Sequence, residues 1–114
     1  MELNKLENEM LIDIYDADMF PGMTFEIENY KLKEEDPLGK KQEFAFYLGK
    51  LKKLGFVKYE EKEAFYKSGT RSNKYSNNVT MICEDKIHID SKGIKLVDCI
   101  YSNSEIQNEM YRCS

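Results

Sequence analysis

Hydrophobic side chains recur at helical spacing near the start of the chain. Residues 2–18 place an apolar residue every three or four positions and gather acids on the other side, a pattern that predicts an amphipathic helix. Pro21 and Gly22 should end this helix, because proline cannot continue the helical hydrogen bonds and glycine supplies a turn. Residues 23–33 leave two interpretations open: their alternation indicates a strand, whereas Thr24 could cap a short helix.

The clearest predicted helix begins near Pro37 and ends before Gly55. Acids precede the proline, as suits the positive end of the helix dipole, and Gly55 stands where a left-handed C-terminal cap is expected. Helical spacing predicts a buried side formed by Phe44, Tyr47, Leu48, Leu51 and Leu54. Rotation by about 100° per residue predicts a cationic outer face formed by Gln42, Glu43, Phe46, Gly49, Lys50 and Lys53.

Two residues of this outer face do not fit a purely cationic surface. Phe46 is a large aromatic residue among lysines, which indicates packing against another element or a partner, or contact with thymine methyl groups. Gly49 lowers helix stability by up to about 1 kcal/mol relative to alanine, which is typical of a position that a backbone or a neighbouring helix approaches closely.

The second half of the chain contains the predicted strands. Residues 56–66 and 79–82 are rich in aromatic and β-branched residues and should pair as a hairpin. Residues 67–78 between them are polar and contain a glycine, so we expect a long exposed loop. Residues 87–89 form either a third strand or a bulge in the second one. Asp90 should cap a helix that continues to about residue 100.

Length and composition predict one domain. With 114 residues, 41% of them hydrophobic, the chain can bury one core but not two independent ones. We expect a single domain over residues 1–114, with its core over about 2–101 and a short helix over about 104–112. No apolar run approaches the roughly 20 residues that span a bilayer, and the N-terminus does not resemble a signal sequence. We therefore expect a cytoplasmic protein with no membrane segment.

The cysteines and the single histidine offer little chemistry. Cys83, Cys99 and Cys113 are odd in number and widely spaced, unlike a zinc site or a disulfide framework, so we expect all three reduced, the first two as small buried hydrophobes and the third exposed. His88 should be an exposed or hydrogen-bonded structural residue. Asp13, Asp16 and Asp18 are explained by a solvated helix face rather than a calcium loop. We expect no enzyme, cofactor or metal.

Positive charge is concentrated in the middle of an acidic chain. The net charge is −4. Residues 1–37 contain eleven acids and three lysines, a charge of −8, whereas residues 38–58 contain six lysines and one acid, a charge of +5. Residues 67–78 add three cations and no acid. Such asymmetry predicts one basic face on an otherwise acidic molecule.

Two local patterns, one on each side of the basic loop, resemble the winged helix-turn-helix superfamily. Residues 48–57 read L-x-x-L-x-x-x-G-F-V, similar to the junction between the recognition helix and the first wing strand. Residues 89–97 read I-D-S-K-G-I-x-L-V, similar to the entry of the helix after the wing in MarR-like, PadR-like and YjcQ-like small proteins. The resemblance covers about residues 44–100. Residues 23–33 depart from the pattern of the superfamily, because they do not look helical.

The resemblance implies an α+β fold with a helical core and a two- or three-stranded antiparallel hairpin as the wing. It also implies a DNA-binding transcription regulator of bacterial or phage type, without a cofactor and homodimeric through the first and last helices. The alternative is a protein–protein interaction module, including a phage-encoded inhibitor with an acidic surface. Candidate contacts to double-stranded DNA are Lys40, Lys41, Gln42, Lys50, Lys53, Lys67, Arg71, Asn73 and Lys74.

Overall fold

A capping box determines where the first helix begins. In the computed structural model, which describes residues 3–105, helix α1 spans Lys5–Met19. The Asn4 side chain accepts the Glu7 backbone N–H at 2.8 Å, and the Glu7 carboxylate accepts the Asn4 N–H at 3.0 Å, so two otherwise unpaired donors are satisfied. The helix predicted over residues 2–18 is confirmed, with a start three residues later.

The segment between α1 and the next long helix is mostly irregular. Its one regular element is the 3-10 turn η1 (Ile27–Asn29), which follows Glu26 and has no side-chain cap, so the strand and the short helix capped by Thr24 are both wrong. Phe25 and Tyr30 on either side of η1 are buried, and both rings lie 5.5 Å from the ring of Phe44. Aromatic packing therefore holds this segment in place where backbone hydrogen bonds are few.

Helix α2 (Pro37–Lys53) begins and ends as the sequence predicts. The Asp36 side chain caps it by accepting the Gly39 N–H at 2.8 Å. Gly55 has φ +81°. The N–H groups of Gly55 and Phe56 donate to the carbonyls of Lys52 and Leu51, which is the Schellman arrangement of a helix C-terminus.

Glu43 of α2 is not on the outer face where the helical spacing places it. Its side chain is fully buried. The carboxylate accepts the backbone N–H groups of Lys33 and Glu34 at 3.1 and 2.9 Å and the Tyr47 hydroxyl at 2.8 Å. The prediction fails because residues 33–34 pass over α2 at this point and supply hydrogen-bond partners that the spacing cannot show.

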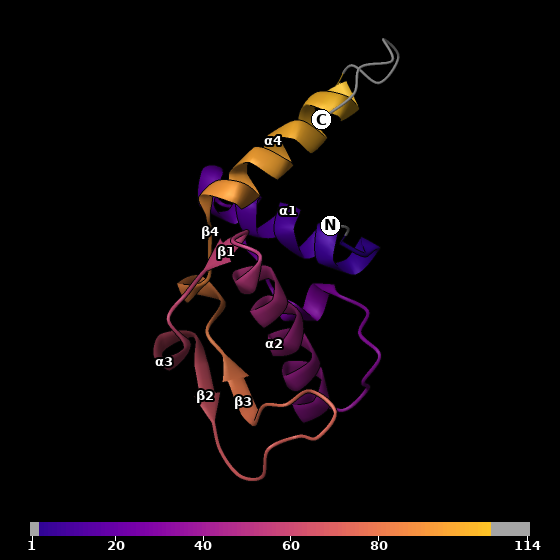
Figure 1. The fold of residues 1–114 in the computed structure, drawn as a ribbon, viewed down its shortest axis with the longest axis vertical. Coiled ribbons are helices and arrows are strands. Elements are labelled where there is room, and N and C mark those ends of the chain that lie inside the picture. Colours follow the sequence, from indigo (N-terminus) through magenta and orange to yellow (C-terminus); the bar gives the residue numbers. More distant parts are fainter. Residues whose placement is uncertain (1–2, 106–114) are drawn as a thin grey trace.

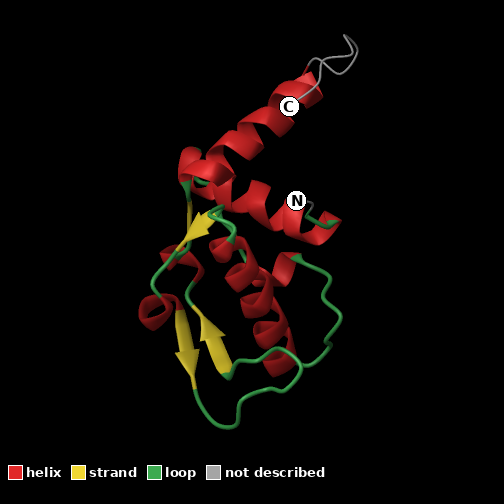
Figure 2. Ribbon diagram, viewed as in Figure 1, coloured by secondary structure: helices red, strands yellow, loops and turns green. Residues whose placement is uncertain are grey.

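Two short antiparallel sheets take the place of the predicted hairpin (Figure 2). Strand β2 pairs with β3 as expected, but the first part of residues 56–66 belongs to a different sheet, because helix α3 interrupts the stretch. The third-strand interpretation of residues 87–89 holds, since β4 pairs with β1. The elements are β1 (Val57–Lys58), α3 (Glu61–Ala64), β2 (Phe65–Lys67), β3 (Val79–Ile82), η2 (Glu84–Lys86) and β4 (His88–Ile89).

Helix α4 (Ser91–Glu105) follows β4 directly. The Asp90 carbonyl accepts the Ile94 N–H, so the helix begins after Asp90 as predicted. The Asp90 carboxylate accepts the N–H of the adjacent Ser91 at 2.7 Å, not that of the second or third helical residue as in a side-chain cap. Gly93 is obligatory here, because a Cβ atom would lie 2.1 Å from the Phe56 carbonyl oxygen. Because α4 is continuous to Glu105, no separate helix begins at residue 104; the rest of the predicted helix, residues 106–112, lies outside the described residues.

The core lies where α1, α2 and the sheets meet, and α4 packs on α1 before projecting from the body (Figure 1). The fold is α+β, with helices and two small antiparallel sheets. Within residues 3–105, no helix has the length and apolar character to cross a membrane. The largest fully buried apolar side chains are Met10, Leu11, Ile14, Phe44, Leu48, Leu51, Val57, Val79 and Val97.

Candidate nucleic-acid interface

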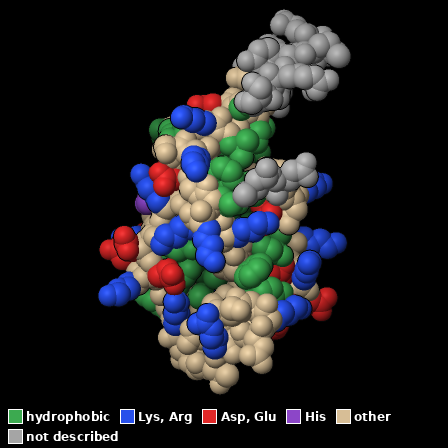
Figure 3. All heavy atoms as spheres, viewed as in Figure 1, with side chains coloured by type: hydrophobic (Ala, Val, Ile, Leu, Met, Phe, Trp, Pro, Cys, Tyr) green, Lys and Arg blue, Asp and Glu red, His purple; other side chains and the backbone are tan. Residues whose placement is uncertain are grey.

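A groove of about 700 Å³ runs between the outer face of α2 and the β2–β3 hairpin with its loop. We call it the α2 groove. Figure 3 shows hydrophobic side chains in a depression on this face, with lysine and arginine side chains around it. Residues that line it include Ala45, Phe46, Gly49, Lys50, Lys53, Tyr59, Phe65, Lys67, Arg71 and Tyr75. The outer face of α2 is therefore one wall of a concave surface rather than an isolated ridge.

Small residues of α2 deepen this groove. Ala45 and Gly49 are four residues apart and so lie one turn apart on the same face of the helix. A Cβ atom added at Gly49 would meet only the Tyr59 hydroxyl, at 4.0 Å. No backbone or neighbouring helix approaches Gly49 closely within the described part of the chain. The prediction that Gly49 allows close packing of another segment is therefore wrong for these residues. The space above Gly49 is open to a ligand.

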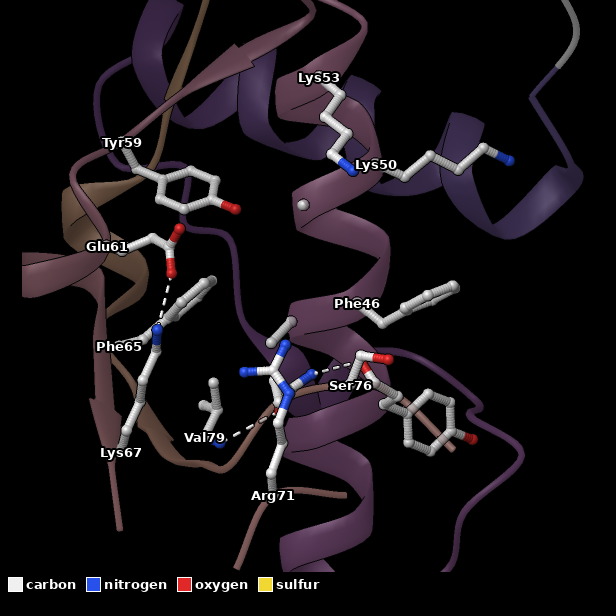
Figure 4. Close-up of a pocket in the computed structure, with 14 residues that line it drawn as sticks. Phe46, Lys50, Lys53, Tyr59, Glu61, Phe65, Lys67, Arg71, Ser76 and Val79 are labelled. Carbon is white, nitrogen blue, oxygen red and sulfur yellow. Dashed lines mark hydrogen bonds and ion pairs between the residues drawn. The ribbon is translucent and has the colours of Figure 1, made fainter. Parts of the chain in front are cut away.

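Lys53 and Arg71 are cations at opposite ends of the groove. Figure 4 shows the Arg71 guanidinium rising from the loop and the Lys53 side chain descending along α2. Neither forms an ion pair with any residue in the range 3–105. Both positive charges are therefore available to an anionic ligand.

Lys67 also lines the groove, but a carboxylate already contacts it. Its ammonium lies 2.8 Å from Glu61 Oε1, and both side chains are largely exposed. The hydrogen bond from Lys67 is the main cause that lowers the pKa of the Glu61 carboxyl. Such exposed pairs contribute about 0–1 kcal/mol, so a phosphate can replace Glu61 at little cost.

Lys50 lines the groove with its aliphatic stem, whereas its charge points elsewhere. Figure 4 shows the side chain extending away from Arg71. The ammonium lies 3.1 and 2.9 Å from the two carboxylate oxygens of Glu7 in α1, whose side chain is 1% exposed. A buried carboxylate therefore occupies the Lys50 ammonium in the structure, and the predicted contact of Lys50 with DNA stays a prediction.

The loop between β2 and β3 is only partly the exposed loop that its composition predicts. Its second half folds back on the body, with Tyr75 buried and its ring centroid 5.9 Å from that of Phe46. Glu34 Oε2 accepts the Lys74 ammonium at 2.6 Å and the Tyr75 hydroxyl at 2.7 Å. These bonds are the cause that lowers the pKa of Glu34. The first half, around Gly69, is exposed.

The remaining predicted contacts lie outside the groove. Lys40 and Lys41, near the start of α2, line a smaller hollow of about 280 Å³ beside Ile27. Gln42 is half-buried, and its backbone carbonyl accepts the Asn77 side chain at 3.1 Å. Asn73 is exposed in the loop. The structure thus brings four of the nine predicted residues into one groove, Lys50, Lys53, Lys67 and Arg71, and leaves Lys40, Lys41, Gln42, Asn73 and Lys74 around it.

Apart from Phe46, the aromatic lining is the part of the groove that sequence reasoning missed. Phe46 is 46% exposed at the groove edge, and its ring lies beside the rings of Tyr47 and Tyr75. Tyr59 follows β1, and its burial raises the pKa of its hydroxyl well above the usual range, so the hydroxyl is a hydrogen-bond donor at neutral pH. Tyr75 was detectable as the single aromatic residue of an otherwise polar loop.

The three aspartates of α1 are exposed or half-buried, but they also bond within the molecule, so a solvated face explains them only in part. Asp13 accepts the Tyr30 hydroxyl, and Asp16 accepts that of Tyr101. Asp18 accepts the backbone N–H of residue 89 and contacts the half-exposed His88 ring at 2.9 Å, which confirms His88 as a hydrogen-bonded structural residue. Among the residues described, no group of three or more His, Cys, Asp or Glu is placed to hold a metal.

The cysteines differ from the expectation at one position. Cys83 is a free thiol, half-buried after β3. Cys99 of α4 is disulfide-bonded, so the prediction that all three are reduced is wrong there. Cys113 lies outside the described residues.

Comparison of the chain with models of protein families, with curated proteins and with solved structures finds no match.

Proposed function

We propose that the protein binds double-stranded DNA through the α2 groove and acts as a transcription regulator of the winged-helix class. One observation carries the proposal: cations from α2 and from the β2–β3 hairpin, distant in sequence, line the same groove. Lys53 and Arg71 lie there without an ion pair among residues 3–105, although the Arg71 charge helps to lower the pKa of the Glu61 carboxyl. A row of phosphates is the ligand that such an arrangement favours.

In this proposal, α2 is the recognition helix and the β2–β3 hairpin is the wing. A duplex placed on this face would lay one sugar–phosphate strand along the groove, between the helix and the hairpin loop. Lys53 and Arg71 would contact its phosphates from the two sides, and the exposed first half of the loop would reach the neighbouring minor groove. Lys40, Lys41 and Gln42 near the helix start would extend the contact along the duplex.

The order of elements from α2 to α4 supports the winged-helix assignment, as do the left-handed Gly55 and the obligatory Gly93 of the two sequence patterns. The segment between α1 and α2 departs from that class, because it contains one 3-10 turn where a helix would be expected. We further propose a cytoplasmic homodimer that pairs through α1 and α4, two helices that pack against each other (Figure 1).

The alternative, an inhibitor that presents acids in imitation of DNA, has weaker support. Asp13, Asp16 and Asp18 of α1 accept hydrogen bonds from the molecule's own side chains and backbone. Glu7 of the same helix is buried. These carboxylates are therefore not arranged as a free row of surface charges, which DNA mimicry requires.

Binding to a random-sequence duplex, measured by fluorescence anisotropy at several salt concentrations, tests the proposal. We expect affinity that falls steeply between about 50 and 200 mM salt. Lys53→Ala and Arg71→Ala should each weaken binding and reduce the salt slope by about 1, because each removes one phosphate contact.

Lys86→Ala and Lys95→Ala are the matched controls, since both lysines are exposed and neither lines the groove. They remove the same charge and should leave the slope nearly unchanged. Equal losses in all four variants would show that only net charge matters and would refute the groove as the site. Absence of binding at the lowest salt would refute the function itself.

A further inference from the structure

The α2 groove has features that a duplex does not use. Its volume of about 700 Å³ lies within the range of sites that enclose a small molecule, roughly 300–1,000 Å³. One sugar–phosphate strand of a duplex can lie along a groove of this size, but the paired bases of the duplex cannot enter it. The interior is large enough for about one or two nucleotides of a single strand, with their bases turned toward the protein.

Phe46 presents an exposed aromatic surface that duplex DNA cannot cover well. The side chain is 46% exposed, and its ring packs against Tyr47 and Tyr75 with centroid distances of 5.9 Å each. Bases inside a duplex stack on each other, so their faces are not free. Bases of an unpaired strand stack on aromatic side chains, and this contact is tolerant of sequence because every base has a π-face.

Gly49 provides the second observation. Glycine inside a helix lowers its stability by about 1 kcal/mol relative to alanine, and nothing among the described residues requires its small size, since a Cβ atom would meet only the Tyr59 hydroxyl at 4.0 Å. Its effect is to keep the groove open above the α2 backbone. A glycine kept at a cost in stability, at the base of an open groove, is typical of close approach by a ligand.

The charges complete the arrangement. Lys53 and Arg71 enter the groove from opposite ends, and the Tyr59 hydroxyl lies beside the space above Gly49 as a hydrogen-bond donor (Figure 4). A cationic groove that follows a phosphate backbone, combined with aromatic side chains on which bases stack, is the common design of proteins that bind single-stranded nucleic acid.

We infer that the α2 groove binds single-stranded nucleic acid, with the backbone between Lys53 and Arg71 and a base stacked on Phe46. The inference rests on the proposed function in one respect: both assign the α2 groove to nucleic acid. It differs in the ligand, which is a single strand held inside the groove between α2 and the hairpin. The shared chemistry is an unpaired polynucleotide, from either DNA or RNA.

The test measures anisotropy with labelled oligothymidylate, oligouridylate and a random duplex, each of about twelve nucleotides or base pairs, within the ~4–16 nucleotides of known single-strand sites. Phe46→Ala should weaken binding of the single strands roughly five- to hundredfold, the usual effect of losing one stacked base, and affect the duplex much less. Leu38→Ala is the matched control, because Leu38 is an equally exposed apolar residue of α2 outside the groove.

Gly49→Leu separates a ligand site from a structural role. The branched side chain would fill the groove from a position where its Cβ fits, so the protein should keep its circular dichroism spectrum and melt at the same or a higher temperature while single-strand affinity falls at least tenfold. Gly49→Ala serves if leucine disturbs the fold; it should raise the melting temperature and lower single-strand affinity. Binding of thymidylate but not uridylate, or the reverse, identifies DNA or RNA as the source.

The outcomes distinguish the two hypotheses. Duplex binding without single-strand binding, or single-strand affinity unchanged in both Gly49 variants, overturns the inference and leaves the proposed function intact. Single-strand binding that depends on Phe46 and Gly49, without duplex binding, supports the inference and overturns the proposed function. No binding of any probe at low salt overturns both.

Discussion

Glu7 is one of the two charged side chains that are almost fully buried among the described residues, and its surroundings explain the position of Lys50. The carboxylate accepts the Asn4 N–H and contacts the Lys50 ammonium with both oxygens. A buried carboxylate must be compensated, because transfer of a charge from water to the protein interior is costly. Lys50 is therefore a structural residue first, although its stem lines the groove.

We predict that Lys50→Ala lowers the free energy of unfolding by about 2 kcal/mol, because it leaves the Glu7 carboxylate buried with one partner fewer. Lys53→Ala, on the same face of α2, should change stability by less than about 0.5 kcal/mol. Urea denaturation followed by circular dichroism measures both. The double variant Glu7→Gln with Lys50→Met should recover most of the loss; equal stability of the two single alanine variants would disprove the role of the pair.

Residue-level prediction from the sequence succeeded where a position depends on its own helix and failed where it depends on another segment. Helical spacing placed Phe44 and Leu48 in the core and Lys53 outside, as observed. It placed Glu43 outside, although residues 33–34 cover that residue. It also could not show that Lys50 meets an acid 43 positions away.

At the scale of elements, two reciprocal bonds fix α4 to α1. The Tyr15 hydroxyl donates to Asp98 and the Tyr101 hydroxyl donates to Asp16, each at 2.5 Å, and the two rings lie 5.8 Å apart. The bond to Asp98 is the largest cause that raises the pKa of Tyr15, whereas burial is the largest cause that raises the pKa of Tyr101. The pairs hold the middle of α4, at Asp98 and Tyr101, against the last turns of α1.

We predict that Tyr101→Phe lowers the free energy of unfolding by about 1 kcal/mol, because a partly buried Asp16 loses its hydroxyl donor. Amide hydrogen exchange should increase in α4 more than in α2. Tyr66→Phe is the control, since Tyr66 is the most exposed of the large apolar side chains and its hydroxyl has no bond within residues 3–105. Identical exchange in both variants would mean that α4 is held by apolar packing alone.

The loop between β2 and β3 is held by Glu34, and this contact has a defined pH dependence. The bonds from Lys74 and Tyr75 lower the pKa of Glu34 below its ordinary 4.5. A carboxyl whose pKa is lower in the folded state stabilises that state at pH values above 4.5, and the contribution is lost as the pH falls through the lowered value. The second half of the loop should therefore loosen only in acid.

Glu34→Gln reproduces the charge loss at neutral pH. We predict that trypsin then cleaves faster after Arg71 and Lys74, because the loop leaves the body more often. Glu35→Gln removes the same charge from an exposed neighbour with no side-chain bond among the described residues, and its cleavage rate should match the wild type. Cleavage at equal rates in the two variants would show that Tyr75 burial alone holds the loop.

Prediction of elements from the sequence was accurate where the signal is local. Asp36 with Pro37 begins α2 and Gly55 ends it, because capping depends on a few adjacent residues. The division of residues 56–66 between two sheets was not predicted, because β1 pairs with residues about 31 positions later in the chain. Short apolar runs have no feature that identifies a distant partner.

For the whole molecule, the acids and the cations have different surroundings. The acids of α1 and Glu34 bond within the protein, whereas Lys53 and Arg71 have no ion pair in the described part of the chain. The net charge of −4 therefore understates the attraction of the groove face for a polyanion, because local unpaired charge, rather than net charge, contacts a ligand. Charge counted along the sequence predicted this face, but not the aromatic groove within it.

The salt dependence of duplex binding gives the number of protomers on the DNA. Four cations near the groove form no ion pair within residues 3–105: Lys40, Lys41, Lys53 and Arg71. If each contacts one phosphate, at about −0.9 per phosphate, the slope of log affinity against log salt should be near −4 for one protomer. The proposed homodimer on a palindromic duplex should give about −7. Sedimentation of the free and bound protein supplies the mass independently, and a slope near −4 with a monomeric mass would rule out the dimer.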